Sequence, residues 1–263
     1  RKDLRINDYV IVRRAGDVIP EVVSSLKDRR DGSQKKWELP KKCPCGEFSI
    51  ELIDEEKVPR CEGGQSCNLA KKEAIIFFGS KSGLEIDGLG RETVETLLES
   101  KLINNVEDIY SLKYEDLIDL PSWEKKKTNN LLNAIKSSTN ASPEKLLTAL
   151  GIRFIGKRTS QLLIQNFNSI DGVLNAKESD IESIHGISIS VSKSLEDWKS
   201  NKENINLLNQ LKNYGFAFKK DIKTSKSYLS GNTFVITGTL DNYSRQDVVD
   251  ILESYGGTVT TSV

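Results

Sequence analysis

A short pattern that returns four times limits what the middle of this chain can fold into. Each copy is an apolar turn followed by a run whose apolar residues stand three or four apart, as Val94, Leu97 and Leu98 do. Internal similarity at a fixed period indicates one supersecondary unit used repeatedly, and this apolar spacing is typical of helices. The sequence therefore predicts four helical hairpins, each made of two short helices joined by a tight turn. The matching turn positions are Gly90, Glu124, Gly156 and Ser188, at intervals of 34, 32 and 32 residues.

The third copy, LGIRFIGKRTSQLL at 150–163, indicates what such a turn offers chemically. Backbone N–H groups in the first turn of a helix lack helical partners and carry the positive end of the helix dipole, so they favour a phosphate oxygen. Gly156 lets a phosphate approach the backbone, and Lys157 and Arg158 add positive charge. Four such turns predict a grip on a sugar-phosphate backbone that reads no sequence and weakens with salt. The alternative is a helical scaffold whose glycines only make turns. Four copies in register favour the phosphate-binding interpretation.

The four copies are not equivalent, so we expect most contacts from the third and fourth copies and then from the first. The second copy has Ser122 and Glu124 in place of glycine, and its Lys125–Lys127 run either contacts phosphate or forms a solvated face. Arg13 and Arg14 are adjacent in a predicted strand, so at most one faces a given side, and an ion-paired surface role fits equally well. The candidate nucleic-acid contacts are Arg13, Arg14, Gly88, Gly90, Arg91, Gly156, Lys157, Arg158, Gly186, Ser188 and Lys193.

All four cysteines of the chain lie close together in the sequence, at Cys43, Cys45, Cys61 and Cys67. Such clustering suits a metal site in a reducing compartment better than a disulfide framework. Four thiolates in two knuckles satisfy tetrahedral Zn²⁺ and leave no open position, so the predicted site is structural. The first knuckle, Cys-x-Cys, is shorter than the usual Cys-x-x-Cys, and the alternative is a set of free thiols.

Short β-type segments are predicted at both ends of the chain. Two β-branched runs within 9–26 flank Ala15-Gly16-Asp17 and indicate a strand, a tight turn and a second strand, with Pro20 favouring a sheet edge. Residues 233–263 indicate a strand over 233–240, a helix capped by Ser244 and stopped at Gly256, and another strand. A piece of this size cannot bury a core alone. We therefore expect the chain to be part of a longer protein.

Composition and the remaining motifs mainly exclude classes of protein and of site. The chain has 38 basic and 38 acidic side chains, so net charge alone points to no partner. No apolar run approaches the ~18 residues of a membrane span, and no signal-like N-terminus is present. No acid–base pair, nucleophile or Walker-type loop is visible. The three tryptophans and the single histidine, His185, are expected to be structural.

Taken together, these motifs resemble the C-terminal half of the bacterial NAD-dependent DNA ligases. VIVRRAGDVIPEVV is similar to the late OB-fold strands of that family, CPCG with RCEGGQSC to its zinc finger, DGLG, GIRFIGKR and IHGIS to its helix-hairpin-helix motifs, and LSGNTFVITGTL to its BRCT domain. The resemblance implies a mainly α, multi-domain chain. Its expected parts are a partial OB-fold at 1–40, a four-cysteine zinc finger at 41–73, four helix-hairpin-helix units at 74–218 and a partial α/β BRCT domain at 228–263.

The resemblance also implies an activity whose chemistry lies upstream. The family forms a lysyl-AMP from NAD with Mg²⁺ and seals nicks between 5′-phosphate and 3′-hydroxyl in duplex DNA, in replication and repair. Its Lys-x-Asp-Gly motif does not occur in this sequence. By this likeness the four cysteines are zinc ligands, Thr237 and Gly238 form a BRCT turn that can accept a phosphate, and the protein is a monomer in the bacterial cytoplasm. The alternatives are a non-catalytic helix-hairpin-helix scaffold, a repair-nuclease subunit, or a protein-interaction piece.

Overall fold

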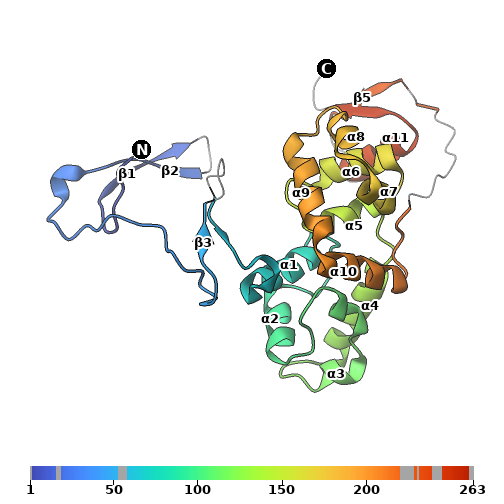
Figure 1. The fold of residues 1–263 in the computed structure, drawn as a ribbon, viewed down its shortest axis with the longest axis horizontal. Coiled ribbons are helices and arrows are strands. Elements are labelled where there is room, and N and C mark those ends of the chain that lie inside the picture. The colour runs from blue at the N-terminus through green and yellow to red at the C-terminus, as the bar shows by residue number, and fades with distance from the viewer. Residues whose placement is uncertain are drawn as a thin grey trace. The chain divides into compact units, whose positions relative to one another are not determined.

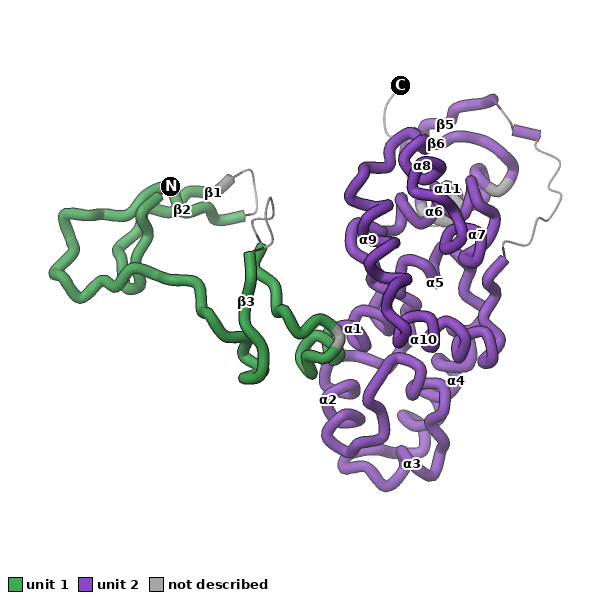
Figure 2. Tube along the Cα trace, in the orientation of Figure 1, with its two compact units in different colours: residues 1–73 green, residues 74–263 purple. Residues whose placement is uncertain are grey.

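A computed structural model describes residues 2–15, 19–52, 58–219, 228–229, 231–238 and 245–260. The chain divides into two compact units, residues 1–73 and 74–263, each of which is considered by itself (Figure 2). The first unit holds short strands and the second is built mostly of helices (Figure 1). The fold class expected from the sequence, mainly α with small β pieces, is confirmed.

The first unit begins with the predicted hairpin. Strands β1 (Val10–Ala15) and β2 (Ile19–Ser25) pair antiparallel, and their register shifts between Ile11 and Val12. Gly16 and Asp17 of the expected turn lie outside the described residues, and a short 3-10 helix, η1 (Lys27–Arg29), follows β2.

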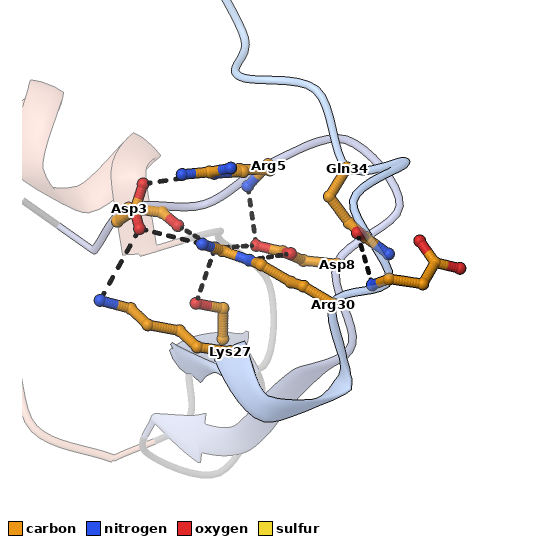
Figure 3. A network of polar contacts seen from close by, with 8 residues as sticks. Asp3, Arg5, Asp8, Lys27, Arg30 and Gln34 are labelled. Atoms are coloured by element: carbon orange, nitrogen blue, oxygen red, sulfur yellow. Dashed lines mark hydrogen bonds and ion pairs between the residues drawn. The ribbon is translucent and has the colours of Figure 1, made fainter.

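A polar network ties the segments on either side of this hairpin together (Figure 3). The Arg30 guanidinium donates two hydrogen bonds of 2.7 Å to the carboxylate of Asp8 and one of 3.0 Å to that of Asp3. The Asp8 side chain is only 2% exposed. Hydrogen bonds from Arg30 hold the pKa of both carboxyl groups below the ordinary range. These charged hydrogen bonds therefore hold residues 3–8 against the segment that follows β2.

The cysteine segment forms a small hairpin followed by a helix. Strands β3 (Ile50–Glu51) and β4 (Arg60–Cys61) pair antiparallel, η2 (Gly64–Ser66) follows, and α1 (Asn68–Gly79) starts directly after Cys67. A Cβ added to Gly63 would lie 2.3 Å from the Phe48 ring, so a larger residue there would force this ring to move.

Helices fill the second unit in the predicted repeat (Figure 1). The elements are α2 (Arg91–Glu99), η3 (Glu107–Ser111), α3 (Tyr114–Ile118), α4 (Lys125–Ser138), α5 (Pro143–Ala149), α6 (Lys157–Phe167), α7 (Ile170–Asn175), α8 (Glu178–Glu182), α9 (Ile189–Ser200) and α10 (Lys202–Asn213). We name the turns at 86–90, 120–124, 152–156 and 184–188 the first to fourth hairpin turns. They lead into α2, α4, α6 and α9.

One apolar core supports all four hairpins. Val94 and Leu97, two of the positions chosen for their helical spacing, are fully buried, and Leu98 packs against the same core. The ring of Tyr110 packs edge-on against Phe78 and Phe216. Fully buried aliphatic residues come from most of the helices, among them Leu117, Leu131, Leu146, Leu163, Ile170, Ile181, Leu195 and Leu211.

The tryptophans only partly follow expectation. Trp123 is buried and Trp198 packs against the core, as predicted. Trp37 is 59% exposed, so its expected packing role is wrong. The expectation failed because the described part of residues 1–73 buries no large apolar side chain against which an indole could pack.

The C-terminal piece has a strand, a helix and a strand. Strand β5 (Thr233–Val235) pairs parallel with β6 (Thr258–Thr260), and α11 (Arg245–Ser254) lies between them in the sequence. Of the strand expected over 233–240, residues 233–235 are confirmed, 236–238 are not in a strand, and 239–240 lie outside the described residues. Gly256, with a φ of 86°, ends α11 as predicted, whereas Ser244 lies outside the described residues.

Across the residues that the structure describes, none of the helices combines the length and the apolar character needed to cross a membrane.

Candidate nucleic-acid interface

The four hairpin turns share one backbone shape. The third residue of each turn is left-handed, with φ of 83° at Gly88, 65° at Ser122, 61° at Phe154 and 89° at Gly186. The next residue is apolar and faces the core, and the one after it is the N-cap of the second helix. These N-caps are the four turn positions aligned from the sequence, so the predicted repeat is confirmed. The second turn keeps this shape without glycine.

The helices that follow these turns begin at an N-cap residue whose side chain forms no capping hydrogen bond, as do the short helices α3 and α8, whereas three other helices are capped. The first turns of α5, α7 and α10 are capped by the side chains of Ser142, Ser169 and Asn201, each of which accepts a hydrogen bond from a backbone N–H. At the N-caps of α2, α4, α6 and α9, all within the described residues, no side chain forms such a bond, although Ser188 has a side chain of capping type. Their first-turn N–H groups therefore suit an acceptor from outside the protein.

The hairpins are brought together in two pairs. A Cβ added to Gly88 would lie 3.7 Å from Leu131 of α4, so the first turn packs on the second hairpin. A Cβ added to Gly186 would lie 3.8 Å from Leu162 of α6, so the fourth turn packs on the third hairpin. A hollow of about 320 Å³ between the first and second turns is lined by Asp87, Gly88, Trp123, Glu124, Lys126, Lys127, Asn130 and Leu131.

Charge is distributed unequally over the four turns. The third turn leads into exposed Lys157 and Arg158, and the first turn of α6 holds no acidic residue. The first hairpin follows Arg91 with Glu92, and in the second Lys127 lies 4.4 Å from the centre of the Trp123 ring. In the fourth, Ser188 and Lys193 are exposed, as is His185, which was expected to be structural.

The arginines of β1 lie in the other compact unit. Arg13 forms an ion pair of 3.2 Å with Glu21 on β2, which is the ion-paired alternative left open by the sequence. Arg14 is exposed and stands opposite Pro20 in the strand register. At the far end of the chain, Thr237 and Gly238 are exposed, and Gly238 has a φ of 80°.

The four cysteines converge as a metal centre requires. Their sulfur atoms, from Cys43, Cys45, Cys61 and Cys67, all lie within 4.8 Å of one another, and none forms a disulfide. In a tetrahedral zinc site with Zn–S distances of about 2.3 Å, sulfur atoms are about 3.8 Å apart, so the cluster could hold such an ion after slight contraction. The short Cys-x-Cys knuckle is closed by Gly46, whose φ is 84° and whose N–H donates to the Cys43 carbonyl at 2.9 Å.

The electrostatics of the thiols also suit a bound cation. Burial raises the pKa of Cys61 to about 12. Burial opposes ionisation of Cys45 too, but hydrogen bonds from the backbone of Glu47 and Phe48 and from neighbouring thiols lower its pKa to about 7. A cluster that stabilises a thiolate at one position and penalises it at another needs positive charge before all four thiols can ionise.

Two features of the structure were not identified from the sequence. The Arg30 network joins residues 22 and 27 positions apart, and no local pattern signals such pairing. Phe154 is an exposed aromatic residue in a left-handed turn position. It could have been found by comparing, across the four aligned turns, the residue that precedes the buried apolar residue.

Comparison with known proteins matches these regions to known domain families. Models of four families match, in chain order: the NAD-dependent DNA ligase OB-fold domain at 1–34, a SAM-like helix-hairpin-helix tandem at 84–137, a helix-hairpin-helix motif at 145–208 and the BRCA1 C Terminus (BRCT) domain at 224–263. The fold and the matches thus define a multi-domain helix-hairpin-helix protein.

Whole-chain relatives narrow this class. The chain is 39% identical over 264 residues to a DNA ligase of Thermoanaerobacter pseudethanolicus, covering 100% of the chain and 40% of the relative. It is 35% identical, again over its full length, to DNA ligases of Pelotomaculum thermopropionicum and Bacillus cereus strain AH187, of which it covers 39% and 40%. Over its whole length the chain is thus similar to DNA ligases, and its residues 1–34 match the NAD-dependent DNA ligase OB-fold domain. The chain spans about 40% of the length of the curated relatives it matches.

Proposed function

We propose that this chain is the DNA-gripping part of an NAD-dependent DNA ligase that seals nicks in duplex DNA during replication and repair. The observation that carries the proposal is the set of four hairpin turns whose second helices begin without a side-chain cap. Backbone N–H groups at such helix ends bind phosphate oxygens and position a protein without reading sequence. We expect the main contacts at Gly156, Lys157, Arg158, Gly186, Ser188 and Lys193, then at Gly88, Gly90 and Arg91, with Arg13 and Arg14 as further candidates.

The chemistry of sealing would be supplied outside this chain. In the proposed reaction NAD provides AMP to a lysine of the upstream domain, Mg²⁺ assists, and the AMP passes to the 5′-phosphate before the 3′-hydroxyl displaces it. The residues of this chain hold the duplex and take no part in proton transfer. We assign no catalytic residue here. Thr237 and Gly238 stay a proposed BRCT phosphate turn.

The four-cysteine cluster would hold one structural zinc ion. Its four-thiolate donor set matches the closed tetrahedral sites in which zinc has no catalytic position. We propose the boundaries 1–40, 41–73, 74–218 and 228–263 for the OB-fold part, zinc finger, helix-hairpin-helix domain and BRCT part, and a monomer in the bacterial cytoplasm. The alternative of a non-catalytic scaffold or nuclease subunit is less favoured, because the ligase OB-fold match covers 1–34 and the ligase relatives match the whole chain.

The test is the salt dependence of binding to nicked duplex DNA by the full-length protein. Replacing Lys157 and Arg158 together by Ala should weaken binding to all sequences and reduce the slope of log K against log salt by about 1 to 2, since each phosphate contact contributes about 0.9. The matched control replaces Lys177 and Lys202, exposed lysines outside the hairpin turns, and should keep the wild-type slope. Equal slopes in all three proteins would contradict the proposal.

A further inference from the structure

The third hairpin turn places a bulky side chain where its three counterparts place little or none. The left-handed position holds Gly88, Ser122 and Gly186 in the other turns, and Phe154 in the third, with a φ of 61°. A residue with a bulky side chain is a conformational outlier in this region, because its Cβ approaches the backbone. Such outliers persist where the surroundings impose them, and they are common at sites of binding.

The fold does not use Phe154 to fill its core. Ile152 and Ile155, on either side of it, are each 4% exposed, whereas Phe154 is 51% exposed. The guanidinium carbon of Arg153 lies 5.0 Å from the centre of its ring. The turn is therefore anchored by its neighbours, and the aromatic ring is held at the surface beside a cation.

The fourth hairpin also exposes an apolar side chain, three positions after the one equivalent to Phe154. The first residue of the second helix is basic in three hairpins, as Arg91, Lys125 and Lys157, but in the fourth it is Ile189, which is 59% exposed. The third and fourth hairpins are the pair joined through Gly186 and Leu162. Exposed apolar side chains thus occur at the turns of this pair, where the first pair has small or basic residues.

The surroundings indicate what these apolar groups contact. Phe154 is two residues from the N-cap of α6 and is followed by exposed Lys157 and Arg158, so a partner that seats there presents negative charge beside an apolar surface. A DNA groove offers both, since phosphates line its edges and sugar and base edges form its floor. Proteins that bind the minor groove place apolar side chains against base steps in this way.

We propose that Phe154, with Ile189 as its companion, packs into the DNA groove and makes the third and fourth hairpins sensitive to groove shape as well as to charge. This inference rests on the proposed function, because it assumes that the hairpins bind duplex DNA. It separates two kinds of contact within one turn: a charged one that fixes the backbone, and an apolar one that adds affinity without releasing counterions.

The experiment measures nicked-duplex binding by the full-length protein across a salt series for Phe154→Gly. Glycine suits the left-handed position, so thermal stability should not fall. We expect binding about tenfold weaker, in line with the stacking of one aromatic side chain, with an unchanged salt slope. Ser122→Gly, the same replacement at the equivalent turn, is the matched control and should bind as wild type. Phe154→Leu keeps an apolar side chain, so its DNA affinity should lie between those of wild type and Phe154→Gly.

The outcomes separate this inference from the function on which it rests. If wild type binds with a steep salt dependence and Phe154→Gly binds equally well, the groove contact is wrong and the phosphate grip stands. A reduced slope for Phe154→Gly would also overturn the inference, since it would mean that the ring acts through the neighbouring charges. If wild type shows no salt-dependent binding, the proposed function fails and the inference fails with it.

Discussion

Each of the two compact units of this chain is stabilised internally by a different kind of interaction. In the described part of residues 1–73, the buried residues are Gln34, Cys43 and Cys67, and the close contacts are the Arg30 network and the four thiols. Residues 74–263 instead contain a continuous apolar core. A small segment that cannot bury enough apolar surface depends on charge pairs or a metal. A repeated helical unit with a full core can leave its helix N-termini uncapped at the surface.

Removal of the metal should have the largest effect, and it should act on the cysteine segment of the first unit alone. A chelator should abolish protection of the backbone amides of 41–52 and 58–67 from hydrogen exchange, because metal-binding free energy is folding free energy in small sites. The helices of 84–213, measured in the same sample, serve as the internal control and should keep their protection. Identical exchange of the cysteine segment with and without chelator would contradict a bound structural metal.

A core truncation should have the next largest effect, and only in the helical unit. Leu146 is fully buried, so Leu146→Ala should lower the free energy of unfolding by about 2–5 kcal/mol. The matched control is Val12→Ala in β1, where the side chain is 53% exposed and the expected change is below about 0.5 kcal/mol. Denaturant unfolding of both variants checks this, and equal losses would remove the proposed difference between the units.

Acid should weaken the first unit selectively. The pKa values of Asp3 and Asp8 are lowered in the folded state by hydrogen bonds from Arg30. The stabilisation is therefore fully present above the ordinary carboxyl pKa of about 3.9 and is lost as pH falls through the lower folded values. The urea midpoint of the first unit, measured from about pH 7 to about pH 3, should fall at the acid end. Arg30→Gln should flatten this dependence, whereas Arg14→Gln should leave it as in wild type.

Charge removal at the hairpin surface should have the smallest effect on stability. Lys157 and Arg158 are exposed, so replacing both by Ala should change the free energy of unfolding by less than about 0.5 kcal/mol. The same change is expected to weaken DNA binding, which would show that charge serves binding in the helical unit and cohesion in the first unit. A large loss of stability would mean that these side chains support the fold.

How much the sequence could predict depends on how local each signal is. The N-caps of the four hairpins were located correctly, because apolar spacing and turn residues lie within a few positions of each cap. The cysteine cluster was found for another reason, because all four cysteines of the chain fall in one segment and cysteine is a characteristic zinc ligand. The Arg30 network was missed because its partners are distant in sequence, and Trp37 was misjudged because packing depends on the whole unit. The left-handed φ at Ser122 and Phe154 was missed because neither residue is of a type that commonly adopts it, and only alignment with Gly88 and Gly186 indicates it.

The most direct test of the central claim is amide exchange of the full-length protein with and without nicked duplex DNA. The claim is that uncapped hairpin helices seat phosphates on their first-turn N–H groups. Binding should therefore slow exchange at 157–159 and 189–191 most, and at 91–93 next, while the side-chain-capped starts of α7 (170–172) and α10 (202–204) stay unchanged. Equal protection at capped and uncapped helices, or no protection at the hairpin turns of a protein that binds the DNA, would contradict the account.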